Sequence, residues 1–178
     1  MTPIYPACVA PRTYRNPACS AIAGAPQPIF GVYPHGLQQH EDFCAVLQAD
    51  RDAVALCDPF TVVREAGDEL VAVPLTDAYG AHTQAIAAEL EAAAEALAAD
   101  DSEAALREYL KAAAQAFVDN HWEPADEAWA AMNGRNSKWY LRVAPDEVYW
   151  EPCALKAGIH MTFAAINTDS LTWQDRLN

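Results

Sequence analysis

The chain has 178 residues, which is the length of one domain, or of one domain with a short arm, and is enough to bury a substantial core. Its 11 Lys and Arg residues against 25 Asp and Glu residues give a net charge of −14, which argues against a protein that binds the phosphate backbone of nucleic acid. Hydrophobic residues make up 52% and charged residues 20%, a balance typical of folded globular proteins, and no run approaches the roughly 18 uncharged apolar residues that a membrane-spanning helix needs.

Residues 1–36 are rich in proline and show no hydrophobic period. We expect them to form an extended arm that lies on the domain or is partly disordered, followed by a single domain over residues 37–178. The start of the chain has no basic segment followed by an apolar run, so it is not a secretory signal. The sequence is compatible both with a cytoplasmic protein and with an exported protein whose leader has been removed.

The next segments predict a short helix and a hairpin. Within residues 38–56, Phe43, Val46 and Leu47 lie at helical spacing. Two β-branched runs follow, 61–64 and 70–73, on either side of a turn at residues 66–69, which is typical of a β-hairpin. Pro74 should end the second strand and place it at a sheet edge.

Two antiparallel helices are predicted next. The first begins at Thr76 or Asp77 as N-cap, and Asp100-Asp101-Ser102 ends it and caps the second. The expected buried stripe of the first helix is Ile86, Leu90, Ala93 and Leu97. That of the second helix is Leu106, Tyr109, Leu110, Ala113, Phe117 and Val118. A third, short helix should begin at Glu123-Pro124, because proline suits the first turn of a helix.

The last third of the chain predicts strands. After a polar turn at residues 133–138 we expect strands over 139–143 and 147–150, split by Ala144-Pro145-Asp146, and a further strand over 159–166. Asp169-Ser170 should cap a helix that starts at Leu171 and runs only a turn or two to Asn178, as if the chain were the N-terminal part of a larger protein. Because strands and helices cluster and do not alternate, the fold class is α+β: a helical hairpin and short helices on a small, mostly antiparallel sheet.

The five cysteines are Cys8, Cys19, Cys44, Cys57 and Cys153. An odd number leaves at least one free thiol in a monomer. The main expectation is that they are buried, reduced thiols that pack as small hydrophobic groups. The alternative is one or two disulfides that tether the proline-rich arm, for instance through Cys8 and Cys19.

Several catalytic motifs are absent from the sequence. No two of the five histidines are separated by four residues, so the HExxH arrangement of a zinc peptidase does not occur. The GxSxG elbow, the P-loop and the GxGxxG motif are missing as well. We therefore assign no catalytic residue, no metal ligand and no cofactor to this chain.

The segment with the most chemical character is 136–153, where aromatic and charged residues are interleaved. On a strand this pattern places polar groups beside aromatic walls, as in a cleft that holds a peptide or a sugar. The candidate substrate-binding residues in or near it are Trp139, Tyr140, Arg142, Glu147, Tyr149, Trp150, Glu151, Lys156 and His160. The simpler interpretation is that the aromatics are core residues and that Arg142 forms a structural ion pair with Glu151 or Asp146.

Residues 58–75 (DPFTVVREAGDELVAVPL), the Ala- and Glu-rich helical pair, and the tryptophan-containing block 117–177 resemble one known family. The chain resembles the N-terminal part of bacterial zinc metallopeptidase homologues related to dipeptidyl-peptidase III, over about residues 44–177. In such proteins the HExxH-like motif and a further glutamate lie downstream of the matched region, so the resemblance implies that the zinc ligands and the general base are outside this chain.

The resemblance implies that 136–160 forms a wall of the substrate cleft, that the chain is inactive alone, and that zinc is bound only if a downstream catalytic part exists. The implied partners are that C-terminal part, a second copy of the chain, and a peptide ligand. Two other functions stay open. One is a stand-alone acidic binding or interaction module that uses the segment 136–160. The other is an enzyme in which Asp146, Glu147 or Glu151 act as acid and base.

Overall fold

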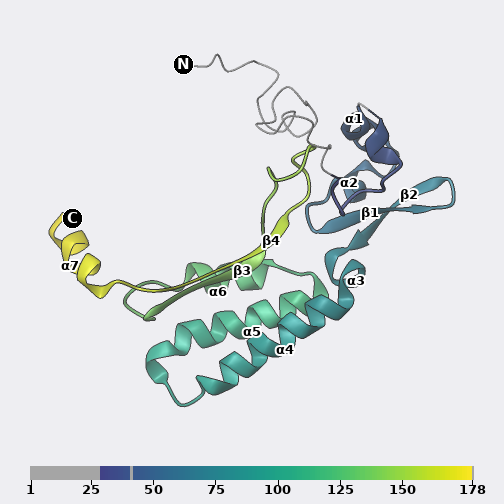
Figure 1. The fold of residues 1–178 in the computed structure, drawn as a ribbon. Coiled ribbons are helices and arrows are strands. Elements are labelled where there is room, and N and C mark those ends of the chain that lie inside the picture. The colour runs from purple at the N-terminus through teal and green to yellow at the C-terminus, as the bar shows by residue number, and fades with distance from the viewer. Residues whose placement is uncertain (1–28, 41, 178) are drawn as a thin grey trace. The chain divides into compact units, whose positions relative to one another are not determined.

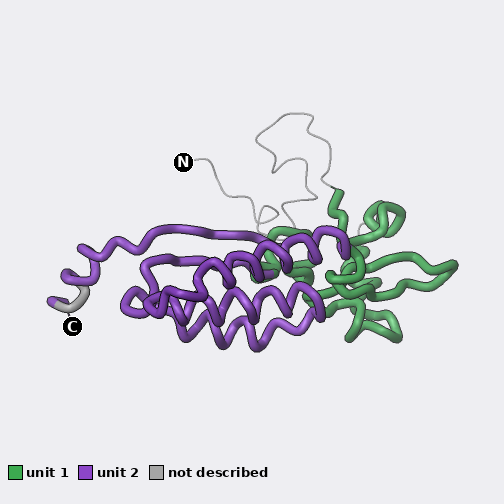
Figure 2. Tube along the Cα trace, turned by 90° about the horizontal axis from the view of Figure 1, so that it is seen from below, with its two compact units in different colours: residues 1–78, 145–158 green, residues 79–144, 159–178 purple. Residues whose placement is uncertain are grey.

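The computed structural model describes residues 29–40 and 42–177, which form two compact units (Figure 2). Unit 1 takes its described residues from the stretches 1–78 and 145–158, and unit 2 from 79–144 and 159–178. The chain therefore leaves unit 1 after residue 78, forms residues 79–144 of unit 2, returns to unit 1 over 145–158, and then completes unit 2. Residues 1–28 of the arm predicted over 1–36 lie outside the described residues.

The helical part of unit 1 consists of short pieces: a 3-10 turn η4 (Leu37–Gln39), α1 (Phe43–Ala49), α2 (Ala53–Leu56) and α3 (Leu75–Ala78). One helix was expected within 38–56. The chain breaks between α1 and α2 because the carboxylate of Asp50 accepts a hydrogen bond from the amide of Asp52 at 2.9 Å, a turn that competes with the helix. Of the three residues at helical spacing, Phe43 and Leu47 are buried, whereas Val46 is 47% exposed.

The predicted hairpin is confirmed. Strands β1 (Thr61–Ala66) and β2 (Glu69–Pro74) pair antiparallel, from Thr61 opposite Pro74 to Ala66 opposite Glu69 (Figure 1). Gly67 in the turn has a φ of 65°, a left-handed conformation that glycine adopts without strain. Pro74 ends β2, as the sequence indicated.

The described end of the proline-rich segment packs within unit 1. Phe30 and Tyr33 are buried, and the amide of Val63 in β1 donates to the carbonyl of Val32 at 2.9 Å. The side-chain amide of Gln38 accepts from the Phe30 amide at 2.9 Å and donates to the Phe30 and Tyr33 carbonyls at 3.0 Å each. Residues 29–36 are thus held within unit 1 by backbone hydrogen bonds and buried aromatic side chains.

Unit 2 contains the predicted antiparallel helices, α4 (Gly80–Ala96) and α5 (Ala104–Asp119), with the 3-10 turn η5 (Asp101–Glu103) between them (Figure 1). The expectation of one helix starting at Thr76 is wrong, because Tyr79 is non-helical and separates α3 from α4. The carboxylate of Asp100 accepts from the amide of Ser102 and so caps η5, whereas Glu103, the N-cap residue of α5, makes no side-chain cap hydrogen bond. The segment 100–102 thus ends the first helix as predicted, but its cap belongs to η5 and not to α5.

The buried stripes of the two helices differ from those expected. The buried residues of α4 are Thr83, Ala87, Leu90 and Ala94, so only Leu90 of the predicted stripe is buried. In α5 the predicted residues are buried except Val118, which is 55% exposed, and Ala114 and Ala116 are buried as well. In an Ala-rich helix several faces have nearly the same hydrophobicity, so sequence spacing alone does not select the buried one.

The rest of unit 2 comprises α6 (Glu123–Ala130), which begins at the predicted proline turn, and α7 (Thr168–Leu177). Helix α7 begins before the predicted Leu171 because Asn167 accepts a hydrogen bond from the amide of Asp169 at 3.1 Å and so acts as the capping residue.

Strands β3 (Trp139–Glu147) and β4 (Gly158–Ala165) form a second antiparallel pair, and β4 matches the strand expected over 159–166. The predicted break at 144–146 is wrong, since β3 continues through Pro145 and ends at Glu147, the first residue of the expected second strand; residues 148–150 are not strand. Proline is compatible with this strand because each strand of a two-stranded sheet has an edge that donates to no neighbour. The class is α+β, as predicted.

Candidate functional site

The structure divides the predicted site residues between the two units. Unit 2 holds Trp139, Tyr140, Arg142 and His160, which lie on β3 and β4. Unit 1 holds Glu147, Tyr149, Trp150, Glu151 and Lys156, at the end of β3 and in the segment 148–157, which we call the anchored loop. Each group is built from its own contacts.

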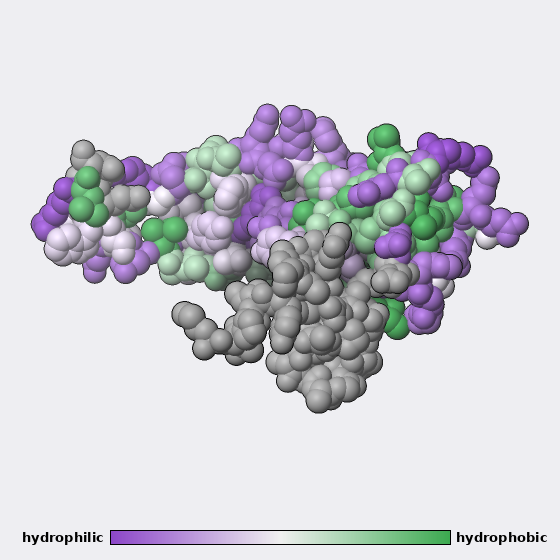
Figure 3. Space-filling model, turned by 90° about the horizontal axis from the view of Figure 1, so that it is seen from above, coloured by the Kyte–Doolittle hydropathy of each residue, from purple (hydrophilic) through white to green (hydrophobic). Residues whose placement is uncertain are grey.

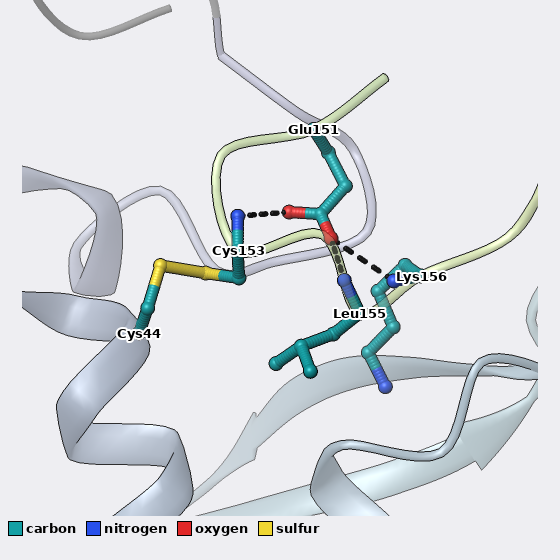
Figure 4. Close-up of a disulfide and its surroundings, with 5 residues drawn as sticks. All are labelled: Cys44, Glu151, Cys153, Leu155 and Lys156. Carbon is teal, nitrogen blue, oxygen red and sulfur yellow. Dashed lines mark hydrogen bonds between the residues drawn. A yellow bond between two sulfur atoms is a disulfide. The ribbon is translucent and has the colours of Figure 1, made fainter. Parts of the chain in front are cut away.

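A disulfide between Cys44 and Cys153 fixes the anchored loop to α1 (Figure 4). The expectation that the cysteines are reduced is therefore wrong for this pair, and Cys57 is the free cysteine among the described residues. The two cysteines are 109 residues apart, and no local pattern in the sequence joins positions so distant. The suggested pairing of Cys8 with Cys19 lies outside the described residues.

Glu151 organises the anchored loop from within. Its side chain is fully buried, and its carboxylate accepts hydrogen bonds from the amides of Cys153 at 2.7 Å, of Lys156 at 3.0 Å and of Leu155 (Figure 4). Ala154, inside this turn, has a φ of 53°. A buried carboxylate that accepts several amide bonds is compensated for its desolvation. Glu151 thus holds the loop closed and does not present its carboxylate to solvent.

Lys156 fastens the same loop to the start of β1. Its ammonium group donates to the carbonyl oxygen of Asp58 at 2.7 Å and to the hydroxyl of Thr61 at 2.8 Å, and the residue has no exposed surface. Burial lowers the pKa of Lys156 to about 8, although electrostatic interactions with Asp58, Cys57 and Glu151 oppose the shift. Glu151 and Lys156, the two buried charged residues of the anchored loop, therefore both hold the loop in place.

Trp150 covers the base of the loop. Its indole N–H donates to the carbonyl of Lys156 at 2.7 Å, and its ring meets Phe30 edge to face at 5.6 Å. A Cβ at Gly158 would lie 3.0 Å from the indole nitrogen, so the close approach of the ring requires glycine there.

The exposed members of the unit 1 group are Glu147 and Tyr149. Tyr149 is 61% exposed, and Glu147 lies exposed at the last residue of β3. Beneath the loop, the pKa of Tyr33 is raised by its own burial and by the negative charge of Glu151. The unit 1 group thus consists of the hydrogen-bonded residues Trp150, Glu151 and Lys156 and of two exposed side chains, Glu147 and Tyr149.

In unit 2 the predicted aromatics form two separate contacts. Trp139 stacks on Phe163 of β4 with ring centroids 5.2 Å apart and planes 23° apart. Tyr140, which is 36% exposed, meets Trp129 of α6 edge to face at 6.2 Å. Such pairs are rigid apolar surfaces on which a planar or apolar ligand group can stack.

Arg142 is bound on both sides by α6. Its guanidinium donates to the carboxylate of Asp126 at 2.8 Å and lies over the ring of Trp129, 4.9 Å from the centroid. The side chain of Arg142 is 11% exposed while that of Asp126 is 52% exposed. The ion pair expected for Arg142 exists, but its partner is Asp126 on a helix and neither Glu151 nor Asp146.

Sequence reasoning missed Phe163, Trp129 and Asp126, which complete the unit 2 contacts. Phe163 lies on a predicted strand and Trp129 on a predicted helix, so the sequence predicts the element that carries each residue. It does not predict that Phe163 contacts Trp139 or that Trp129 contacts Tyr140. Asp126 carried no signal, because an exposed carboxylate in the first turn of a helix is common. His160 is exposed on β4.

Two broader properties follow from the described residues. Across 29–40 and 42–177 no three His, Cys, Asp or Glu side chains come together in a way that could hold a metal ion. Within these same ranges none of the helices combines the length and the apolar character needed to cross a membrane.

The fold is related to that of dipeptidyl-peptidase III. Similarity to the structure of dipeptidyl-peptidase III from Caldithrix abyssi has a TM-score of 0.73 at 27% identity, over 88% of this chain and 29% of that chain. For the enzyme from Corallococcus sp. strain EGB the TM-score is 0.68 at 24% identity, over 85% of this chain and 28% of that one. The chain thus spans less than a third of the solved chains that it matches. Neither the models of known protein families nor the curated proteins give a match.

Proposed function

We propose that this chain is the non-catalytic, N-terminal, substrate-cleft portion of a dipeptidyl-peptidase III-like zinc metallopeptidase and that it hydrolyses no peptide by itself. One observation carries the proposal. The similarity to the Caldithrix abyssi structure extends over 88% of this chain but over only 29% of the solved chain, so this sequence corresponds to one portion of a larger protein of that kind.

The distribution of metal-binding residues supports a non-catalytic role. A zinc peptidase needs three protein ligands and a polarised water, and the sequence contains no HExxH motif that would supply two of the ligands. The described residues contain no cluster that could replace it. In this proposal the zinc ligands belong to a separate C-terminal catalytic part, and no step of hydrolysis is assigned to the residues of this chain.

The role proposed for the chain is to hold the peptide. Tyr140 and Tyr149 are exposed and can stack on a side chain or a peptide plane, and Glu147 and His160 are exposed hydrogen-bonding groups. Trp150, Glu151 and Lys156 support this role indirectly, because they fix the anchored loop that carries Tyr149. Trp139 and Arg142 fix β3 in the same way through Phe163 and Asp126.

The test has two measurements on the 178-residue chain. A chromogenic dipeptidyl substrate, assayed with and without added ZnCl₂, should release no product, and turnover that depends on stoichiometric zinc would refute the proposal. A tetrapeptide titrated against tryptophan fluorescence should bind. The Tyr149→Ala variant should bind it about 2- to 12-fold more weakly, the range expected for loss of one aromatic contact. Val54→Ala, a change at an exposed site on α2, is the matched control and should bind as the unaltered chain does.

A further inference from the structure

The hydroxyl group of Tyr33 is a buried donor without an acceptor. Tyr33 is 3% exposed, and its hydroxyl has no hydrogen-bond partner among the described residues. The carboxylate of Glu151 is near, but it already accepts from three amides and makes no hydrogen bond of ordinary geometry with this hydroxyl. Burial raises the pKa of Tyr33, so the hydroxyl keeps its proton. A buried donor of this kind is costly unless some other group accepts from it.

The ammonium group of Lys156 is a second donor in the same unit. It has three N–H groups, and two of them bond to the carbonyl of Asp58 and the hydroxyl of Thr61. The third has no acceptor within the part of the chain that the structure describes. On the face drawn in Figure 3 hydrophobic residues are seen among hydrophilic ones at the surface, whereas Tyr33 and Lys156 are buried in unit 1.

Both donors interact with one side chain, the free thiol of Cys57. Cys57 follows the last residue of α2 and precedes Asp58, whose carbonyl oxygen is 2.7 Å from the ammonium nitrogen of Lys156. Electrostatic interactions join Cys57 to Lys156 and to Tyr33. Unlike the two donors, Cys57 is partly exposed, so a small reagent can reach it from the solvent. A reachable thiol is thus combined with two buried donors that lack acceptors.

We propose that Cys57 is a site of oxidation by peroxide and that Tyr33 and Lys156 hold the resulting sulfenic acid. The thiolate of Cys57 attacks one oxygen of hydrogen peroxide, an S–O bond forms as the O–O bond breaks, and the other oxygen leaves as hydroxide. The sulfur loses two electrons, the peroxide gains them, and the hydroxide takes a proton from water. A thiol is a weak acceptor, whereas the new oxygen can accept from both the Tyr33 hydroxyl and the Lys156 ammonium group.

The surroundings of Cys57 also favour a product that lasts. A sulfenic acid is normally consumed by a nearby thiol or by further oxidation. Cys44 and Cys153 are joined to each other, so neither offers a thiol to Cys57. Hydrogen bonds to the sulfenic acid oxygen lower its free energy and so slow its further reactions. We therefore expect the sulfenic acid to accumulate.

The experiment uses hydrogen peroxide and dimedone, a reagent that traps sulfenic acids. The 178-residue chain is oxidised at neutral pH, the peroxide is removed with catalase, dimedone is added after increasing delays, and peptide mapping by mass spectrometry locates and quantifies the adduct. The adduct should form on Cys57 and should be absent in the Cys57→Ser variant. A chain that forms no adduct on Cys57 would overturn the proposal.

A variant pair tests the two donors. Tyr33→Phe removes one of them and keeps the ring, so the sulfenic acid on Cys57 should decay about 2- to 12-fold faster, the range expected for one hydrogen bond. Tyr79→Phe makes the same change in unit 2 and should leave the decay rate unchanged. Equal decay rates in Tyr33→Phe and the unaltered chain would show that Tyr33 does not hold the product.

Urea unfolding provides a second readout. Before oxidation the Tyr33 hydroxyl has no acceptor, so Tyr33→Phe should unfold at the same urea concentration as the unaltered chain or at a higher one. After oxidation the variant should unfold at the lower concentration of the two. A variant that is already less stable before oxidation would show that the hydroxyl has another partner and would contradict the proposal. None of these outcomes depends on the peptidase assays, so either proposal can fail alone.

Discussion

Removal of the Cys44–Cys153 disulfide should destabilise the protein strongly. The bond joins α1 to the anchored loop across 109 residues, and it restricts the unfolded chain far more than the folded one. For a closed loop of 109 residues the chain-entropy expression gives about 16 cal/mol/K, which is about 4.8 kcal/mol at 25 °C. The double variant Cys44→Ala/Cys153→Ala should lose most of this free energy of unfolding.

Urea unfolding followed by tryptophan fluorescence measures the effect. With a dependence on urea of about 2 kcal/mol/M, the midpoint of the double variant should fall by about 2 M. Cys57→Ser is the matched control, because Cys57 is not part of this disulfide and its replacement should cost less than about 1 kcal/mol. A double variant that unfolds at the same urea concentration as the control would refute the loop-closure reasoning.

Three further predictions concern buried polar groups. Glu151→Ala leaves three amides of the anchored loop without an acceptor and should lower the free energy of unfolding by at least about 3 kcal/mol in urea titrations. The same change at the exposed Glu147 should cost under about 0.5 kcal/mol, and equal effects would contradict the assignment. The pKa of Lys156 is lowered to about 8 in the folded state, so the unfolded state binds more protons above that pH, and stability should rise between about pH 8 and 9.5. Unfolding measured across this range should show a smaller rise in Lys156→Met, and an identical slope in both proteins would count against the role of Lys156. Tyr109→Phe removes a hydroxyl that accepts from the Val143 amide at 2.8 Å and donates to its carbonyl at 3.1 Å. We expect a loss of about 1–3 kcal/mol and faster hydrogen exchange at the Val143 amide, and unchanged exchange would show that water replaces the hydroxyl.

The features that the sequence predicted well are local ones. The β1–β2 hairpin follows from two β-branched runs and a turn containing Gly67, and α6 from a proline at its start. Each depends on residues that are neighbours in the chain, so propensity and spacing are sufficient. The effect of Pro145 was predicted wrongly because it does not depend on neighbouring residues alone. Whether proline interrupts a strand depends on whether its nitrogen faces a neighbouring strand, and that is decided by the sheet.

The candidate site was less predictable because its contacts join distant segments. Within the segment 136–153 the strand over 139–143 was predicted correctly, but residues 148–150 of the strand expected over 147–150 are part of the anchored loop, and the partners of the aromatic and charged side chains were not predicted. Lys156 bonds to Asp58, 98 residues earlier, and Arg142 pairs with Asp126 on a helix. The burial of Glu151 within its own loop also had no sequence signal, since a glutamate is usually exposed.

The return of the chain to unit 1 at residues 145–158 affects how the protein is made. During synthesis α4 and α5 emerge together and can pair early, because their contacts are close in sequence. Unit 1 is completed late, since Glu151, Cys153 and Lys156 leave the ribosome only after residues 79–144 of unit 2. Until then Cys44 is without its partner, and Cys57 is already synthesised and closer along the chain. An oxidising enzyme that acted too early would join the wrong pair, so correct assembly depends on oxidation that is late or that an isomerase can reverse.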